Sequence, residues 1–168
     1  FCFMPDGKVT VEHQRIPEGV VRRLFDHLVM FWTGIQRDAG AVLTEQQRNT
    51  PQRLAQLRAM REHARALQQL MSNGFDPLTF GRVLDQTWEL KRQLASTITT
   101  DQINLWYSQA KAAGAIGGKI CGAGGGGFLL LIMPPDRREA VRAALQSLTD
   151  VSIRYEAHGS RVLLPVGE

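Results

Sequence analysis

The chain has only two cysteines, Cys2 and Cys121, among its 168 residues, and only four histidines. Two distant cysteines cannot build the disulfide framework of a small secreted domain, so the sequence favours a reducing compartment and a cytoplasmic protein. Cys121 itself is either a small buried strand residue or a reactive thiol. The histidines are scattered and lack zinc-ligand spacing to the cysteines, so we predict no metal site.

Long apolar runs, a secretory leader and a strong charge imbalance are also missing. The run Phe128–Met133 has strand length, far below the roughly 18 residues that span a bilayer. The sequence shows no secretory leader, which would have a basic region followed by an apolar one. We therefore predict no membrane partner. No Gly-x-Ser-x-Gly elbow is present to carry a serine nucleophile. A net charge of +4 suits an anionic ligand without requiring nucleic acid.

The length suits one well-cored domain. The chain starts at Phe1 without a methionine, and the apolar residues 1–4 read as a strand entered midway. We therefore expect a fragment of a longer polypeptide, with an N-terminal β-ribbon over residues 1–17 that belongs to a neighbouring domain.

Hydrophobic periodicity and capping residues predict the elements of the remaining chain. Strands are expected at 8–15, 28–32, 115–121, 128–133, 151–155 and 161–164. Helices are expected to begin at Pro17, Arg37, Thr50, Asp76, Thr100 and Asp136. In the last of these, Asp136 and Glu139 resemble a capping box.

From Leu28 onward the predicted order is strand, helices, strand, strand, helix, strand. This is the ferredoxin-like split βαβ arrangement of an α+β fold, with extra helices inserted in its first crossover. It implies an antiparallel sheet with helices packed on one face.

The glycine loop, Gly122–Gly127, reads Gly-Ala-Gly-Gly-Gly-Gly between two apolar runs. Each glycine in an ordered segment costs roughly 0.5–1 kcal/mol relative to alanine. So many suggest that a ligand, a phosphate or another protein segment comes very close to this backbone. A purely structural hairpin with close packing is the alternative.

Two common nucleotide motifs do not explain this loop. Gly122, Gly124 and Gly127 satisfy Gly-x-Gly-x-x-Gly, but the dinucleotide fingerprint needs a helix next, and a strand follows here. A Walker A loop needs lysine where Phe128 stands. The exposed amides of a strand–loop–strand turn can still form an anion-binding concavity.

Residues 117–128 resemble the third conserved motif of the GHMP kinases, a superfamily that includes galactokinase, homoserine kinase, mevalonate kinase and phosphomevalonate kinase. The usual form is Lys-x-Ser/Thr-Gly-Ala-Gly-Gly-Gly-Gly, and Cys121 stands where serine or threonine is common. Residues 28–34, 37–39 and 89–94 further resemble the D-glycero-D-manno-heptose 7-phosphate kinases.

The resemblance implies an enzyme of two halves, of which this chain is the second. The family's N-terminal half carries the ATP phosphate loop, Pro-x-x-x-Gly-Leu/Ile-x-Ser-Ser, and usually the catalytic acid and magnesium ligands; that loop is absent here. Residues 18–168 would be the GHMP kinase C-terminal domain and residues 1–17 the edge of the missing half. ATP, Mg²⁺ and a sugar phosphate would serve the full kinase, while this chain alone would be inactive and hold no catalytic residue or cofactor.

The resemblance also implies which residues face the active site. Those beside the nucleotide phosphate loop, forming the active-site floor, are Lys119, Gly122, Ala123, Gly124, Gly125, Gly126 and Gly127. The substrate-binding candidates are Thr33, Arg37 and Asp38, with Arg37 able to hold a sugar phosphate through a bidentate contact. Alternatively, Arg37 and Asp38 are a surface pair at a helix start, and Lys119 is a solvated strand lysine.

Other interpretations compete with the kinase. A row of arginines along residues 48–65 could contact RNA, but the run 128–133 has one aromatic and no basic residue, unlike an RNA-recognition sheet, so we predict no nucleic acid partner. A regulatory or structural ferredoxin-like domain without catalysis is the other alternative. The partners expected for the kinase are its N-terminal half and a second copy, since an undocked apolar surface favours dimerisation.

Overall fold

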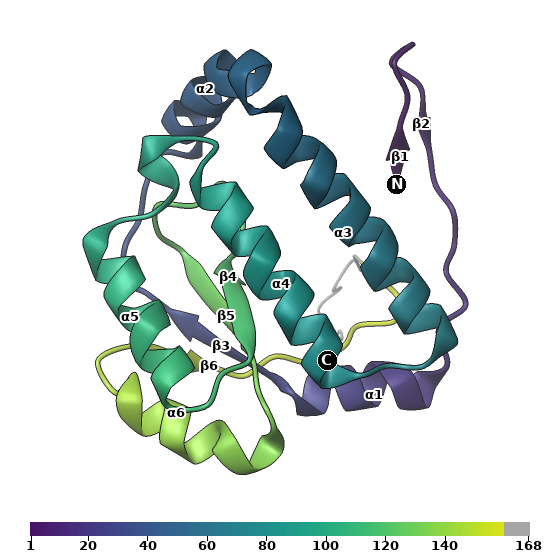
Figure 1. Cartoon of the computed structure of the whole chain (residues 1–168). Helices are drawn as coiled ribbons and strands as arrows, with labels where there is room; N and C mark the ends of the chain where they lie inside the picture. The colour runs from purple at the N-terminus through teal and green to yellow at the C-terminus, as the bar shows by residue number, and fades with distance from the viewer. Residues whose placement is uncertain (160–168) are drawn as a thin grey trace, which may run out of the picture.

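The computed structural model describes residues 1–159, drawn in Figure 1. Its main sheet has four strands, β3 (Leu28–Trp32), β4 (Gly117–Ile120), β5 (Phe128–Ile132) and β6 (Thr149–Val151). The order across the sheet is β4-β5-β3-β6 and every neighbouring pair is antiparallel. This is the strand order of a ferredoxin-like split βαβ unit, so the predicted α+β class is confirmed.

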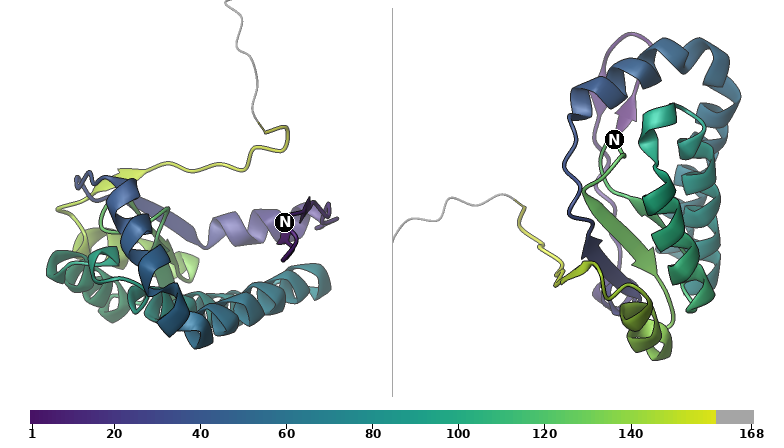
Figure 2. Two further views of the ribbon diagram at one scale, coloured as in Figure 1. Left: turned by 90° about the horizontal axis from the view of Figure 1, so that it is seen from above. Right: turned by 90° about the vertical axis from the view of Figure 1, so that its left-hand side faces the viewer.

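Six helical segments fill the crossover between β3 and β4. They are α2 (Ala39–Asn49), η1 (Thr50–Arg53), α3 (Leu54–Asn73), α4 (Pro77–Arg92) and α5 (Asp101–Ala112), with the short η2 (Ser96–Ile98) between the last two. Before the sheet comes α1 (Glu18–Asp26), and between β5 and β6 come η3 (Pro135–Arg137) and α6 (Arg138–Ala144). The two views of Figure 2 place α3, α4 and α5 on the same side of the sheet.

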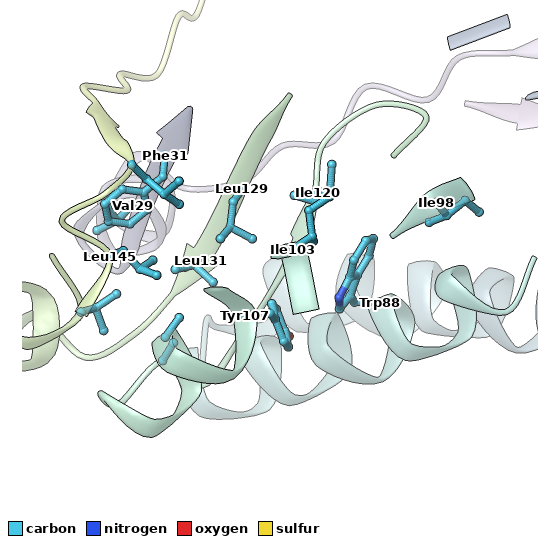
Figure 3. Packing of buried hydrophobic residues seen from close by; sticks show 14 of the residues in the cluster. Val29, Phe31, Trp88, Ile98, Ile103, Tyr107, Ile120, Leu129, Leu131 and Leu145 are labelled. Carbon is cyan, nitrogen blue, oxygen red and sulfur yellow. The ribbon is translucent and has the colours of Figure 1, made fainter. Parts of the chain in front are cut away.

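The core lies between this helical layer and the sheet. Val29 and Phe31 of β3 face the same way as their β5 partners, because paired residues of antiparallel strands share a face. The cluster they form with side chains of α4, α5 and α6 is shown in Figure 3. Trp88 of α4 and Leu129 of β5 are 1% and 0% exposed. Burying each such side chain contributes about 1.5–3 kcal/mol to folding.

Two of the predicted helix starts are confirmed by their caps. The Asp76 carboxylate accepts a hydrogen bond from the Thr79 amide at 2.7 Å, and the Thr100 hydroxyl accepts one from the Ile103 amide at 3.2 Å. Both caps satisfy amides that the first helical turn leaves without a partner.

Two other predicted starts were wrong. Thr50 does not cap a new helix: it is the first residue of η1, which follows α2 directly, and its hydroxyl donates back to the Gln46 carbonyl at 3.0 Å. Asp136 makes no capping box; it lies in η3, and α6 begins at Arg138 without a side-chain cap.

The predicted strand at 151–155 was also displaced. β6 pairs with β3 through Thr149, Asp150 and Val151 only, so the ladder ends where that strand was expected to begin. The predicted strand at 161–164 lies outside the described residues. At the N-terminal end, β1 (Cys2–Phe3) and β2 (Val9–Thr10) form a separate two-stranded ribbon. Strand β2 is shorter than the strand predicted at residues 8–15. In residues 1–159 no helix has the length and apolar character to cross a membrane.

The outer edge of β4 is fastened to the helices by side chains. Lys111 of α5 donates to the Ile116 carbonyl at 2.6 Å and to the Asp85 carboxylate at 2.9 Å. The Tyr107 hydroxyl donates to Asp85 at 2.5 Å and lies 3.3 Å from the Gly118 carbonyl. Burial and the Asp85 carboxylate together raise the pKa of Tyr107 above its usual range. These contacts fix the strand that leads into the glycine loop.

Candidate active-site loop

The glycine loop joins β4 to β5, and its base is closed by the Cys121 amide, which donates to the Phe128 carbonyl at 2.8 Å. Four of its glycines have positive φ values, Gly122 (73°), Gly124 (109°), Gly125 (74°) and Gly127 (84°). Residues that carry a side chain rarely adopt this backbone conformation, so the turn itself requires glycine at these positions.

The protein's own backbone presses against the middle of the loop. A Cβ atom on Gly124 or Gly125 would stand 2.7 Å from the carbonyl oxygen of Ile98 or Thr97 respectively, both in η2. One on Gly126 would stand 2.5 Å from the Ile35 carbonyl oxygen. The sequence suggested that a ligand, a phosphate or another protein segment comes close to this backbone. For these three glycines the close neighbour is a protein segment.

The two ends of the loop are open. A Cβ atom on Gly122 or Gly127 would meet nothing within 4 Å. The Gly125 amide donates to Ile98 and the Gly127 amide to Ile35, which ties the loop to both neighbouring segments. Within residues 1–159 no hydrogen bond is donated by the amides of Gly122, Ala123 and Gly126.

A hollow of about 390 Å³ lies between the loop and the segment that follows β3. Its lining consists of Trp32, Ile35, Gln36, Arg37, Ala39, Cys121, Ala123, Gly124, Gly126 and Gly127. Of the predicted site residues, the structure thus brings Arg37 together with four members of the loop.

Thr33 holds the loop rather than lining the hollow. It is buried, and both its hydroxyl and its amide donate to the Gly127 carbonyl, at 2.7 and 3.0 Å. Its hydroxyl oxygen also accepts from the Ile35 amide at 3.3 Å. The residue therefore ties the end of β3 to the end of the glycine loop.

The neighbouring residues Arg37 and Asp38 make different contacts. Arg37 is exposed, lines the hollow, and makes no ion pair with the described residues. Asp38 caps α2, where its carboxylate accepts from the Gly40 amide at 2.8 Å. The helix-start interpretation therefore describes Asp38, while Arg37 is left free to meet a ligand.

Lys91, which was not among the predicted site residues, reaches the loop from α4. Its ammonium group donates to the Gly122 carbonyl at 2.5 Å. Burial, together with the nearby charge of Lys119 in β4, lowers the pKa of Lys91 to about 8. Lys119 itself is not among the residues that line the hollow. No local pattern could have revealed Lys91, since the contact joins residues 31 positions apart.

Glu45 of α2 was also missed, and it holds η2 in place behind the loop. Its carboxylate accepts from the Ser96 amide, the Ser96 hydroxyl and the Thr97 hydroxyl, each at 2.8 Å. These hydrogen bonds, the Ser96 amide foremost, lower the pKa of Glu45 to about 2. Glu45 thus supports the carbonyls against which the glycines pack.

Trp32, which lines the hollow, packs against a second aromatic ring, that of Phe128. The Trp32 and Phe128 rings lie 4.9 Å apart between centroids, and Phe128 remains 39% exposed. They are paired residues on β3 and β5, on the sheet face away from Phe31 and the core.

The model of the family described as GHMP kinases C terminal matches residues 57–150, which include α4, α5 and the whole glycine loop. The chain belongs to this family. No curated protein sequence gives a significant match to this chain.

Solved kinase structures share the fold of this GHMP kinase domain. L. major mevalonate kinase is 21% identical, with a TM-score of 0.62 over 72% of this chain and 38% of that one. A D-glycero-D-manno-heptose 1-phosphate kinase from Bacteriodes thetaiotaomicron is 20% identical, with a TM-score of 0.59 over 89% of this chain and 39% of that one. Streptococcus pneumoniae phosphomevalonate kinase is 16% identical, with a TM-score of 0.63 over 76% and 38%. The chain thus spans about two fifths of the structures it matches.

Proposed function

We propose that this chain is the substrate-facing, active-site-floor domain of an ATP-dependent sugar kinase that acts on a heptose phosphate. The observation that carries the proposal is the hollow between Arg37 and the glycine loop. Arg37, which forms no ion pair with residues 1–159, and loop amides that donate no hydrogen bond within those residues meet there, and both suit a phosphorylated ligand.

Each lining group has a distinct role in this proposal. Arg37 holds the sugar phosphate through a bidentate contact. The Ala123 and Gly126 amides donate to phosphate oxygens, since phosphoryl transfer depends mostly on positioning and on neutralising the oxygens' charge. Trp32 offers an apolar ring face to the sugar, which favours a cyclic substrate over an acyclic one.

The remaining parts of the reaction belong to the other half of the kinase. ATP and Mg²⁺ would be held by the N-terminal half with its phosphate loop. In the described part of the chain, no three His, Cys, Asp or Glu side chains are grouped to hold a metal ion. We therefore assign no catalytic residue to this chain and expect it to be inactive alone. Two free thiols are compatible with a cytoplasmic enzyme.

Exposed apolar side chains on the N-terminal ribbon support docking of that other half. Phe1 and Phe3 are 83% and 78% exposed, and Val11 is 56% exposed. Residues of this kind are rarely left together in water unless a partner covers them. We propose that the N-terminal half covers the ribbon, and that without it two copies of the chain pair through this surface.

The test is a kinase assay on the chain alone and on the polypeptide that includes the residues encoded upstream of Phe1. The upstream residues should contain the Pro-x-x-x-Gly-Leu/Ile-x-Ser-Ser loop. The longer protein should phosphorylate a heptose phosphate with ATP, and mevalonate poorly. Robust activity of the 168-residue chain alone would refute the division of labour, and absence of the upstream loop would refute the kinase assignment.

Substitution of Arg37 tests the hollow itself. Loss of one charge-assisted contact should raise KM for the sugar phosphate about tenfold in Arg37→Ala, with a smaller change in kcat. Arg48→Ala is the matched control, because Arg48 is an exposed arginine in α2 that does not line the hollow. Equal KM values for the two variants would remove Arg37 from the site.

A further inference from the structure

A second cavity, of about 350 Å³, lies where the end of α2, η1, the end of α4 and the start of η2 meet. Its lining consists of Glu45, Asn49, Arg53, Arg92, Gln93, Ala95 and Ser96. None of these residues lines the hollow beside Arg37. The cavity has the size of a small-molecule site, and its lining is polar apart from one alanine. It is therefore a place, distinct from the hollow, with room for a small polar ligand.

The two arginines of this cavity carry donors that the described chain leaves without acceptors. Arg53 forms no ion pair with residues 1–159. Arg92 donates to the Glu89 carboxylate at 2.8 and 3.1 Å, but only through Nη1. In both side chains Nε is buried and has no hydrogen-bond partner among the described residues. Because a buried donor on a charged group is costly to leave unpaired, both arginines favour a ligand that brings acceptor oxygens.

A backbone amide adds a third donor to the cavity, and the one carboxylate in the lining is already occupied. Ala95 is buried, and within the described chain its amide donates no hydrogen bond. The oxygens of Glu45 accept from the Ser96 amide and from the Ser96 and Thr97 hydroxyls. The negative charge of Glu45 is thus taken up by donors of the domain itself. The Arg53 guanidinium and the Ala95 amide are left for a ligand.

The cavity is connected to the glycine loop through η2. Ser96 lines the cavity, and the two residues after it, Thr97 and Ile98, present the carbonyls against which Gly125 and Gly124 pack. The Gly125 amide donates to the Ile98 carbonyl at 2.7 Å. One three-residue segment therefore touches the cavity at its start and the loop along the rest of its length. A ligand that restrains this segment restrains the loop as well.

We propose that the cavity is an effector site for a small anion, which binds Arg53 and Arg92 through a carboxylate or phosphate group and restrains the glycine loop through η2. Guanidinium groups suit either oxyanion, because their planar donors match two oxygens at once. The Ala95 amide donates to the same group. Binding and its effect on the loop are independent of the proposed kinase function, and only the consequence for substrate affinity rests on it.

The test titrates the 168-residue chain with inorganic phosphate or with citrate, at an ionic strength kept constant with potassium chloride. An Arg37→Ala background removes the arginine of the hollow from the measurement. Nuclear magnetic resonance follows the Ala95 amide signal, whose saturable shift reports binding, and the hydrogen exchange of the Gly125 amide, which reports the effect on the loop. At least one of the two anions should shift the Ala95 signal and slow exchange at Gly125 about fivefold or more.

Variants of the two arginines decide the assignment. Arg53→Gln and Arg92→Gln should each weaken binding of the anion about tenfold or more, because each removes a charge-assisted contact. Arg58→Gln is the matched control, since Arg58 is an exposed arginine of α3 that does not line the cavity and forms no ion pair with residues 1–159. Circular dichroism reports whether each variant folds. Arg53→Gln breaks no ion pair within those residues, so it preserves the test if loss of the Arg92–Glu89 pair unfolds the other variant.

Absence of a saturable shift at Ala95 with both anions, or equal affinity in Arg53→Gln and Arg58→Gln, would overturn the site. Binding without any change at Gly125 would overturn its effector role. Binding by this chain but not by the polypeptide extended upstream of Phe1 would also overturn the proposal, because the other half of the kinase would then fill the cavity. Binding with slower Gly125 exchange in an extended protein that lacks kinase activity would support the effector site and count against the proposed function.

Discussion

A Cβ atom on Gly117 would stand 2.1 Å from the carbonyl oxygen of Gly81, so strand β4 and helix α4 meet backbone to backbone. Real Cβ atoms essentially never come so close to another atom, and neither backbone can move freely. This contact sets the position of the strand from which the glycine loop departs.

Gly117→Ala should therefore destabilise the fold by about 3 kcal/mol, at the upper end of the cost of overpacking. Urea unfolding measures the change. Gly19→Ala is the control, because Gly19 lies in helix α1 with nothing within 4 Å of its Cβ position. That variant should gain roughly 0.5–1 kcal/mol through helix propensity. A loss below 1 kcal/mol in Gly117→Ala would contradict the close packing.

Within the loop, Gly126→Ala and Gly122→Ala should have different effects. Gly126 is pressed against the Ile35 carbonyl, so a methyl group there should displace the loop and accelerate hydrogen exchange of the Gly127 amide, which is bonded to Ile35. Gly122 has open space, so its alanine variant should pay only left-handed backbone strain of about 1–2 kcal/mol. Equal exchange rates at Gly127 in the two variants would show that Ile35 does not restrain the loop.

Removing the charge of Glu45 should loosen η2. Its pKa is lowered from 4.5 to about 2, so its stabilising effect is complete above pH 4.5 and is lost as the pH falls toward 2. Glu45→Gln should speed exchange of the Gly125 amide, which donates to Ile98 in η2. Exchange at pH 6 compares this variant with Glu12→Gln, an exposed carboxylate in the N-terminal segment. No difference between the two would mean that Glu45 does not support the loop.

Because the pKa of Lys91 is lowered, we expect the free energy of unfolding to rise at alkaline pH. Its pKa is lowered from 10.5 to about 8, so between these values the folded chain binds fewer protons than the unfolded chain, and raising the pH favours folding. The raised pKa of Cys121 acts in the opposite direction, so both proteins should carry Cys121→Ala. In that background, urea unfolding at pH 7.5 and 10 should show a gain that Lys91→Met abolishes. A gain of equal size in both would assign the effect to other groups.

The predictions that succeeded depended on local chemistry. Asp76 and Thr100 precede strongly periodic segments, and each caps its helix as expected. Thr50 has the same chemistry, yet the preceding helix continues through it, because one turn of η1 links α2 to α3 without a break. A capping residue therefore marks a helix start only where the chain before it is not already helical.

Only some residues of the candidate site could be predicted from the sequence. The loop and Arg37 could be recognised from the glycine run and a strand end. Glu45 and Lys91 could not, because each acts on a segment more than 30 residues away, Glu45 on η2 and Lys91 on Gly122. Thr33 was predicted as a substrate-binding residue, whereas in the structure its hydroxyl donates a hydrogen bond to the Gly127 carbonyl.

The carbonyls that crowd Gly124–Gly126 have an evolutionary consequence. Because Ile35, Thr97 and Ile98 belong to the domain itself, larger residues at these three positions would be rejected by folding even in a protein that had abandoned catalysis. Retention of the glycine run is thus a record of architecture. A descendant that no longer bound a ligand in the hollow would be recognised instead by loss of Arg37, the proposed ligand contact, beside an otherwise unchanged loop.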